Sequence, residues 1–233
     1  MSMQPDPGEI QQLFDRIAPL YDRLNDSLSF GTHRIWKQMA VNWSGAKGGD
    51  RVLDVCCGSG DIALLLAEVV GPTGTVVGAD FSVAQLEVAR HRSYQQLRSV
   101  DWIQADALQL PFEDESFDAA TMGYGLRNLT DIPQGLHELY RVLKPGAGVA
   151  ILDMHRPQSR GMRAFQQWYL DTLVVPTAQR FRVKEEYAYI APSLDRFPSG
   201  SRQVQLAKLT GFQRVVHYPL MGGMMGVLVA QKP

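Results

Sequence analysis

Short apolar runs alternate with helical patterns through the middle of the chain. The apolar runs predict strands, because each is short and most are bounded by glycine, proline or polar turn residues. They cover residues 51–57, 75–80, 100–105, 117–124 and 148–154. The segments between them predict helices over residues 61–70, 82–98 and 131–143. Strands that alternate with helices indicate a parallel, doubly wound sheet, so the predicted fold class is α/β.

Turn signals set the expected ends of these helices. Ser82 is predicted to cap the helix that follows it, with Gln85 as its capping-box partner. The Lys144-Pro145-Gly146 sequence is predicted to close the helix that ends near Leu143. Each helix is therefore expected to pack on the sheet as a separate, capped element.

Helical periodicity also precedes this central region. Apolar residues recur at helical spacing from Ile10 to Ile17, and a further helix is predicted to begin near Thr32. One face of that further helix should carry its apolar residues, which are Ile35, Trp36, Met39, Ala40 and Trp43. We interpret residues 9–49 as an N-terminal helical cap.

The C-terminal third breaks the alternation. It predicts a helix over residues 163–175, a loose segment over 176–200 and a helix over 201–210 that stops at Gly211. Two strands follow, and the short turn between them requires an antiparallel pair; they cover residues 214–220 and 227–231. We expect one domain over residues 1–233, with a helical lid over 155–200. A doubly wound sheet that ends in such a hairpin is the usual shape of class I S-adenosylmethionine-dependent methyltransferases.

Composition argues against several classes of function. The 233 residues suffice for one α/β domain with a sizeable core. A net charge of −1 argues against a general nucleic-acid binder, so no nucleic-acid partner is expected. The five histidines lack metal-ligand spacing with cysteine or carboxylate, so no metal site is predicted. The two cysteines, Cys56 and Cys57, are adjacent, so a disulfide between them would be strained and a reducing compartment is expected.

The most informative stretch is a glycine-containing turn after the first predicted strand. It runs Asp54-Val55-Cys56-Cys57-Gly58-Ser59-Gly60-Asp61 and leads into an apolar helix. A strand, a glycine turn and a helix form a nucleotide pocket at the carboxyl end of a parallel strand. Gly58 and Gly60 let the backbone approach a ligand closely, because neither carries a Cβ atom.

This turn alone leaves two chemistries open. Its glycine spacing also fits the dinucleotide fingerprint, and Asp80 follows Gly60 by 20 residues, as a ribose-binding acid should. A nicotinamide-dependent oxidoreductase is therefore a real alternative. Asp54 favours a methyl donor, because a pyrophosphate gains nothing from a nearby carboxylate, whereas the methionyl end of a cationic ligand does. Asp106, within Gln104-Ala105-Asp106-Ala107, matches the adenine-binding segment of methyltransferases.

Four motifs make nearly the whole chain similar to one family. The run from Tyr21 to Lys37, Tyr-Asp-x-Leu-Asn-Asp-x-x-Ser-Phe-Gly-x-His-Arg-x-Trp-Lys, resembles the signature of the ubiquinone and menaquinone biosynthesis C-methyltransferases. The glycine turn, Gly125-Leu126-Arg127-Asn128 and Arg141-Val142-Leu143-Lys144-Pro145-Gly146 resemble that family as well. One departure is Cys56, which stands where the general methyltransferase pattern has glycine. The tail resembles the cyanobacterial and plant branch, which methylates demethylphylloquinone, a naphthoquinone with a phytyl tail.

The resemblance implies roles for residues at the strand ends. Binding of S-adenosylmethionine is expected from Asp54, Gly58, Ser59, Gly60, Asp80, Phe81, Asp106, Ala107 and Gly123. Catalysis is expected from Tyr124, Arg127, Asn128 and Asp153. Arg127 would stabilise a developing quinolate or position a water that takes the proton, while Asn128 would hydrogen-bond a quinol oxygen. Asp153 is a further candidate for the base.

The implied acceptor is a lipid quinol. A quinone ring carbon is electrophilic, whereas a quinol carbon beside a hydroxyl is nucleophilic, so the reduced form is the expected substrate. Its apolar tail resides in a bilayer, so we expect transient membrane-surface contact through the lid. The expected location is cytoplasmic, peripheral to the quinone-containing thylakoid membrane.

Other interpretations remain open from the sequence. The acceptor is alternatively demethylmenaquinol, a demethoxybenzoquinol, or another small lipid or aromatic molecule. A non-catalytic binding protein on the same fold is a further alternative. The oligomeric state is open, with a homodimer as one alternative.

Overall fold

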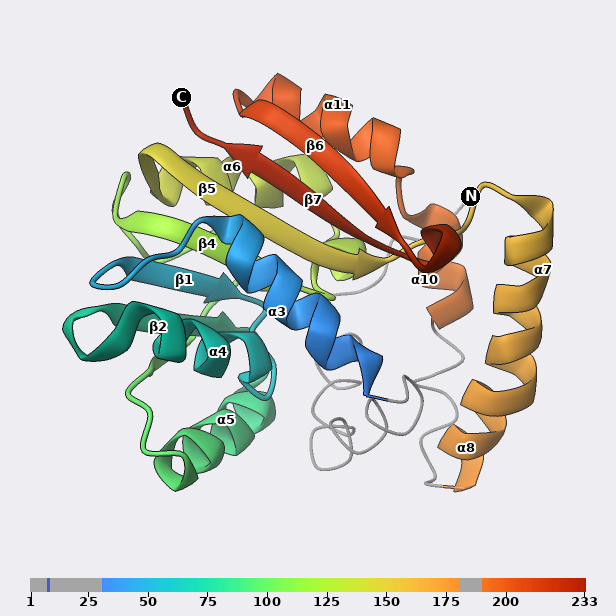
Figure 1. The fold of residues 1–233 in the computed structure, drawn as a ribbon, viewed down its shortest axis with the longest axis horizontal. Coiled ribbons are helices and arrows are strands. Elements are labelled where there is room, and N and C mark those ends of the chain that lie inside the picture. Colours follow the sequence, from blue (N-terminus) through green and yellow to red (C-terminus); the bar gives the residue numbers. More distant parts are fainter. Residues whose placement is uncertain (1–7, 9–30, 181–189) are drawn as a thin grey trace.

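The strands form one sheet that combines a parallel core with an antiparallel edge (Figure 1). The computed structural model describes residue 8, residues 31–180 and residues 190–233. The strands are β1 Arg51–Val55, β2 Thr75–Asp80, β3 Asp101–Gln104, β4 Phe117–Gly123, β5 Leu143–Met154, β6 Gln213–Leu220 and β7 Met225–Gln231. Their order is β3-β2-β1-β4-β5-β7-β6, with β1 to β5 parallel to one another and β7 antiparallel to both β5 and β6. The predicted α/β class and the C-terminal hairpin are confirmed.

Helices cover both faces of this sheet. The helices α3 Thr32–Ser44, α4 Asp61–Val70 and α5 Val83–Gln95 lie on one face, and α6 Ile132–Val142 and α11 Gly200–Thr210 lie on the other (Figure 1). Short 3₁₀ turns connect elements at η1 Gly71–Thr73, η2 Leu126–Asn128 and η4 Met221–Gly223. The chain moves outward from β1 to β3 and then returns to β4, so the strand order reverses between β1 and β4. Parallel sheets bind ligands at such a reversal.

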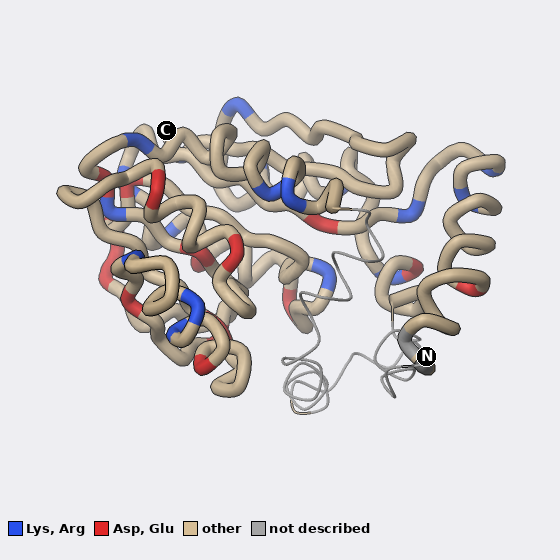
Figure 2. Tube along the Cα trace, turned by 60° about the horizontal axis from the view of Figure 1, so that its bottom comes forward, with Lys and Arg blue, Asp and Glu red and all other residues tan. Residues whose placement is uncertain are grey.

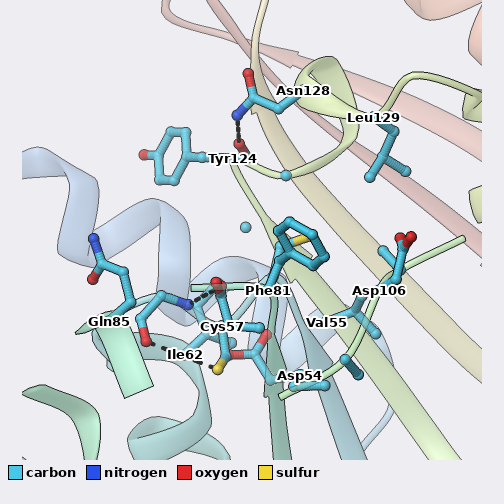
Figure 3. A pocket seen from close by; sticks show the side chains of 18 of the residues that line it. Asp54, Val55, Cys57, Ile62, Phe81, Gln85, Asp106, Tyr124, Asn128 and Leu129 are labelled. Atoms are coloured by element: carbon cyan, nitrogen blue, oxygen red, sulfur yellow. Dashed lines mark hydrogen bonds between the residues drawn. The ribbon is translucent and has the colours of Figure 1, made fainter. Parts of the chain in front are cut away.

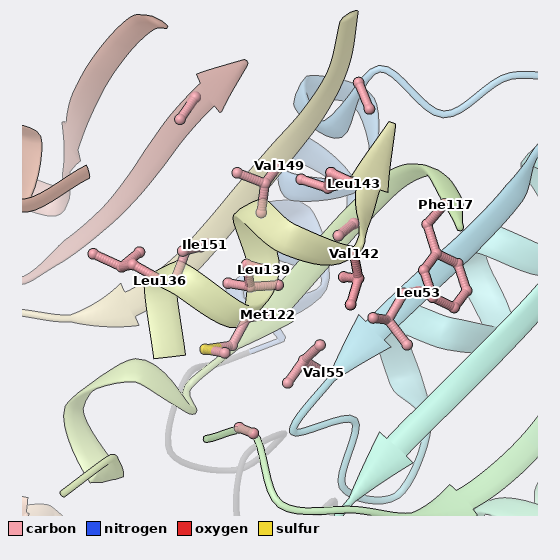
Figure 4. Close-up of a cluster of buried hydrophobic side chains, with 14 of the residues drawn as sticks. Leu53, Val55, Phe117, Met122, Leu136, Leu139, Val142, Leu143, Val149 and Ile151 are labelled. Atoms are coloured by element: carbon pink, nitrogen blue, oxygen red, sulfur yellow. The ribbon is translucent and has the colours of Figure 1, made fainter. Parts of the chain in front are cut away.

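Side-chain alternation along β1 assigns its residues to two different cores. Leu53 and Val55 pack in the cluster that lies under α6, together with Phe117 and Met122 (Figure 4). Val52 packs in the cluster formed with α3 and α4. Because successive strand residues face opposite sides, Asp54 points to the same face as Val52. A carboxylate thus takes a core-facing position on a central strand.

The predicted capping box is only half formed. The Ser82 hydroxyl accepts from the Gln85 N–H at 3.1 Å, as expected, but the Ser82 N–H donates to Asp80 Oδ1 at 2.9 Å. The helix ends at Gln95, three residues before the predicted end at Arg98.

The Lys144-Pro145-Gly146 sequence was predicted to close the preceding helix as a turn. It lies inside β5 instead, because α6 ends at Val142 and β5 begins at the next residue. β5 begins at Leu143, directly after α6, and its pairing with β4 shifts register between Phe117 and Ala119. Gly146 has φ +82°, a left-handed conformation that lets the strand bulge and resume its ladder.

The predicted apolar face of α3 is partly wrong. Ile35 is 61% exposed, whereas the buried residues of the helix are His33, Lys37, Ala40, Val41 and Ser44. Polar groups occupy this buried stripe because they have partners there: the Ser44 hydroxyl donates to the Val41 carbonyl at 2.7 Å, and Lys37 forms an ion pair with Asp61. Hydrophobic periodicity could not detect a stripe stabilised by polar contacts. The helix predicted between Ile10 and Ile17 lies outside the described residues.

The region after β5 is more helical than its composition indicated. The predicted helix at 163–175 is present within a longer run: α7 Arg160–Tyr169, the π-helical turn η3 Leu170–Val174 and α8 Val175–Arg180. The expected loose segment also contains α10 Ile190–Arg196, so that prediction was wrong over these residues. Gly211 stops α11 with φ +117°, as predicted. A lid role for this region stays a prediction.

We predict that Gly60→Ala will destabilise the fold. Gly60 has φ +88°, and an added Cβ would lie 2.5 Å from the Trp102 ring, so the substitution combines backbone strain with overlap. Gly45→Ala is the matched control, because Gly45 has φ +83° but open space around an added Cβ. Chemical denaturation should show a loss of about 1–2 kcal/mol for Gly45→Ala and about 2–5 kcal/mol for Gly60→Ala. Equal losses would show that packing against Trp102 contributes nothing.

Candidate active site

The carboxyl ends of β1, β2, β3 and β4 surround one pocket (Figure 3). It encloses about 1170 Å³ when its open mouth is included, enough for a nucleoside-sized ligand beside a second small molecule. Ten of the predicted site residues line it: Asp54, Gly58, Ser59, Asp80, Phe81, Asp106, Ala107, Gly123, Tyr124 and Asn128. Gly60, Arg127 and Asp153 are not among the lining residues.

Asp80 holds the glycine turn in place. Its Oδ2 accepts from the Gly58 N–H at 2.7 Å, and its Oδ1 accepts from the Ser82 N–H at 2.9 Å. The carboxylate at the end of β2 therefore joins the turn after β1 to the start of α5. Each oxygen keeps further acceptor capacity, so the predicted contact with a ribose diol is compatible with these bonds.

A second carboxylate, Asp61, fixes the other end of the same turn. It opens α4 and forms ion pairs with Lys37 from α3 and Arg92 from α5. Arg92 also donates from NH1 to the Ser59 carbonyl at 2.8 Å and to the Ser59 hydroxyl at 3.1 Å. The two cations hold the pKa of Asp61 well below its usual range, against the opposing effect of burial. Three helices are thereby tied to the turn.

Sequence reasoning assigned no role to this ion-pair cluster. Lys37 and Asp61 stand within family motifs, and that was the only available signal for them. Arg92 lies 31 residues beyond Asp61 in an ordinary helical pattern, so no spacing rule could connect the two.

Asp54 is the most unusual group in the pocket. It is 1% exposed, and its Oδ1 accepts from the Thr121 hydroxyl at 2.7 Å. Its Oδ2 is buried without a hydrogen-bond partner among the described residues. Burial raises the pKa of Asp54 to about 7, although the Thr121 hydrogen bond, the nearby Ala63 backbone N–H and the charge of Lys37 oppose the rise. A ligand ammonium would supply the missing hydrogen bond and charge, so this site fits the methionyl end of S-adenosylmethionine.

Two residues beside the pocket adopt left-handed conformations that favour glycine. Cys56, after β1, has φ +56°, and Tyr124, after β4, has φ +60°. This explains why a glycine is usual where Cys56 stands. The Cys56 side chain is accommodated by Gly125, since a Cβ there would lie 2.6 Å from Cys56 Cβ. Such strain at about 1–3 kcal/mol per residue is typical of functional sites.

Neither cysteine is an activated nucleophile. Burial raises the pKa of the Cys56 and Cys57 thiols well above the usual range, and the nearby charges of Asp80 and Asp54 raise it further. Both side chains are therefore protonated near neutral pH, which leaves them as parts of the pocket wall.

A buried ion pair between Arg127 and Asp153 fixes the strained segment after β4. Arg127 donates from NH1 to Asp153 Oδ1 and to the Tyr124 carbonyl, and its backbone N–H donates to Asp153 Oδ2 at 3.0 Å. Asn128 donates from Nδ2 to the same Tyr124 carbonyl at 3.0 Å. Two predicted catalytic residues, Arg127 and Asp153, thus bind each other.

Asn128 presents a polar atom for a ligand. Its Oδ1 is buried without a hydrogen-bond partner among the described residues. Because Nδ2 is held by the Tyr124 carbonyl, the orientation of the amide places Oδ1 as an acceptor (Figure 3). A hydroxyl group is the natural partner for such an acceptor.

The opposite wall suits an aromatic base. Phe81 is 39% exposed and lines the pocket after β2, and its carbonyl accepts from Gln104 Nε2 at 3.2 Å. Asp106 accepts from the Leu108 N–H at 2.8 Å, which fixes the segment after β3 while leaving a second carboxylate oxygen. The predicted adenine contacts of Asp106 and Ala107 are compatible with this geometry.

Comparison with known proteins identifies close relatives. A family model described as the ubiE/COQ5 methyltransferase family matches residues 3–232. The 2-phytyl-1,4-naphthoquinone methyltransferase of Trichormus variabilis is 62% identical over 227 residues, which is 97% of this chain and 99% of that protein. The chloroplastic 2-phytyl-1,4-beta-naphthoquinone methyltransferase of Arabidopsis thaliana is 51% identical over 97% of this chain and 88% of its own length.

A solved structure agrees on the fold. A SAM-dependent methyltransferase from Thermotoga maritima superposes with a TM-score of 0.68 at 22% identity, covering 96% of this chain and 99% of that one. At this identity the likeness establishes the shared fold only.

Asp54 should make donor binding depend on pH. In the free protein the pKa of Asp54 is about 7, so its carboxyl is mostly protonated below pH 7. A bound ammonium favours the ionised carboxylate, so binding below pH 7 requires Asp54 to release its proton. The affinity for S-adenosylhomocysteine, which carries the same amino group, should fall by up to about tenfold for each pH unit between 7 and 5.5. Asp54→Asn should bind more weakly with little pH dependence. Calorimetry that finds pH-independent binding by the natural protein would contradict this role.

Proposed function

Because this chain belongs to the ubiE/COQ5 methyltransferase family, we propose that it methylates a ring carbon of 2-phytyl-1,4-naphthoquinol, using S-adenosylmethionine. The chain is an S-adenosylmethionine-dependent methyltransferase, and relatives with 51% and 62% identity carry the 2-phytyl-1,4-naphthoquinone methyltransferase name. The observation that carries the proposal is the buried Asp54 carboxylate, with one oxygen unpaired among the described residues, at the end of β1. A nicotinamide cofactor offers no ammonium group that could donate a hydrogen bond to that carboxylate, which disfavours the oxidoreductase alternative.

The donor would occupy the part of the pocket between β1 and β3. Asp54 would hold its amino group, Asp80 its ribose, and Asp106 with Phe81 its adenine. When bound, S-adenosylmethionine supplies an electrophilic methyl group. The described part of the protein contributes orientation through a turn that Asp80, Asp61 and Arg92 hold in one conformation, and such preorganisation lowers the barrier to transfer.

The acceptor ring would lie against the segment after β4. Asn128 Oδ1 would accept a hydrogen bond from a quinol hydroxyl, which raises electron density at the neighbouring ring carbon. Leu129 lies beside Asn128 and supplies an apolar surface for the ring (Figure 3). Arg127 enters this proposal as a positioning residue, because it binds Asp153 and the Tyr124 carbonyl and thereby fixes the strained backbone that carries Asn128.

The helix α7 would contact the bilayer surface, from which the lipid substrate would reach the pocket. This helix exposes Phe165 and Trp168, whose ring centroids lie 5.7 Å apart. Arg160 and Arg163 are exposed near its start, and Figure 2 marks the Lys and Arg positions along the chain in blue. The half-exposed Met221 adds to the same region, since its neighbour Gly222 packs against Met162 of α7. Aromatic residues flanked by arginines suit the interface of an anionic membrane. No described helix is long and apolar enough to span a bilayer.

Methyl transfer should require the reduced acceptor. We expect methylated product from 2-phytyl-1,4-naphthoquinone and labelled S-adenosylmethionine when a chemical reductant is present, and none when it is omitted under air. The reason is that only the quinol ring carbon is nucleophilic. A control with substrate and reductant but no protein excludes spontaneous methylation. Equal yields with and without reductant would refute the quinol mechanism.

Vesicle binding should depend on the exposed face of α7. The double variant Phe165→Ser with Trp168→Ser should reduce co-flotation with vesicles of phosphatidylcholine and phosphatidylglycerol several-fold, because it removes the apolar anchor. Leu209→Ser is the matched control: Leu209 is 79% exposed on α11, which lies apart from α7 (Figure 1). The membrane proposal fails if the control and the double variant lose binding equally, or if the natural protein does not float.

A further inference from the structure

Lys37 is a buried cation at the edge of the pocket. It lies in the middle of α3 with 5% of its surface exposed, and its ammonium forms an ion pair with Asp61. Lysine is rarely buried to this extent, because removing its charge from water is costly even when a partner is present. Neighbouring buried positions of the same helix are occupied by Ala40 and Val41. The ammonium therefore calls for an explanation beyond packing.

The ammonium faces the pocket next to Asp54. Lys37 lines the pocket together with Asp61 and Asp54, and its positive charge lowers the pKa of Asp54 against the effect of burial. It also lies 5.8 Å from the ring centroid of Tyr124. A positive and a negative side chain thus stand at the same end of the pocket, beside the glycine turn.

Lys37 shares its carboxylate partner with a second cation. Asp61 is the shared partner of Lys37 and Arg92, so one carboxylate serves two cations. Arg92 uses its other contacts on the Ser59 carbonyl and hydroxyl, away from the position of Lys37. An ammonium carries three protons, and the hydrogen bond that Lys37 donates to Asp61 uses one of them, so the group keeps capacity for an anion from the pocket. The first turn of α4 adds its own positive dipole end.

These charges match the head of an amino acid, which carries an ammonium and a carboxylate on one carbon. We propose that Lys37 binds the α-carboxylate of the methionyl group of S-adenosylmethionine, while Asp54 binds its α-amino group. The inference rests on the proposed donor and deepens it, since it makes Lys37 the residue that selects a donor with an intact carboxylate. The competing role for Lys37 is purely structural, as a support for Asp61 and the turn.

A donor that lacks only the carboxylate separates these roles. Calorimetry would compare S-adenosylmethionine with decarboxylated S-adenosylmethionine, which keeps the sulfonium and the amine. The natural protein should bind S-adenosylmethionine about 10- to 100-fold more tightly, the range expected for a charge-assisted contact. Lys37→Gln, which can still hydrogen-bond Asp61, should lose most of this preference. Its affinity for S-adenosylmethionine should fall, while its affinity for the decarboxylated ligand should stay the same.

Arg92→Met is the matched control, because it removes the other cation of Asp61, and Arg92 itself does not line the pocket. It should weaken both ligands alike and keep the preference. Lys37→Met serves as a second neutral variant if Lys37→Gln fails to fold, as judged by circular dichroism. The proposal is overturned if the natural protein shows no preference, or if a folded Lys37 variant keeps it. A natural protein that binds neither ligand would instead refute the proposed donor.

Discussion

The burial of Asp54 is the constraint around which the pocket is arranged. The residue lies on the central strand β1, in register with Gly78 of β2 and Thr121 of β4, so the sheet fixes its position. An ionised carboxylate in such a place is costly unless it is paired. Thr121 satisfies one oxygen, and the other has no hydrogen-bond partner among the described residues. In our proposal, the amino group of the donor would pair with that second oxygen.

The turns around this carboxylate show how the fold positions chemistry. Parallel pairing brings the ends of β1, β2 and β4 to one edge, and each end is then fixed by a charged group. Asp80 and Arg92 hold the turn after β1, while the Arg127–Asp153 pair holds the segment after β4. These bonds maintain the left-handed backbone of Cys56 and Tyr124. The strain is thus stabilised by buried electrostatics, and the result is a pocket with fixed walls.

Local pattern was sufficient for the sheet and for the strand-end carboxylates. Strand periodicity located β1 to β7, and the positions of Asp54, Asp80 and Asp106 after successive strands placed them in one pocket, because parallel strands end at a common edge. Local pattern could not predict which polar residues pair across long distances in the sequence. The buried stripe of α3, the tie from Arg92 to the glycine turn, and the Arg127–Asp153 pair all join segments distant in sequence. The bulge of β5 at Gly146 was missed because Lys-Pro-Gly also marks an ordinary turn.

The central claim is that this pocket directs a methyl group to a ring carbon of a reduced naphthoquinone. Carbon-13 NMR of the product formed from S-adenosylmethionine labelled in its methyl group tests it most directly, since the chemical shift distinguishes methyl on carbon from methyl on oxygen. We expect a single aryl methyl signal, from a methyl group on the ring carbon next to a quinol hydroxyl. A methoxy signal would contradict it, because the hydroxyl that we place at Asn128 would then be the nucleophile.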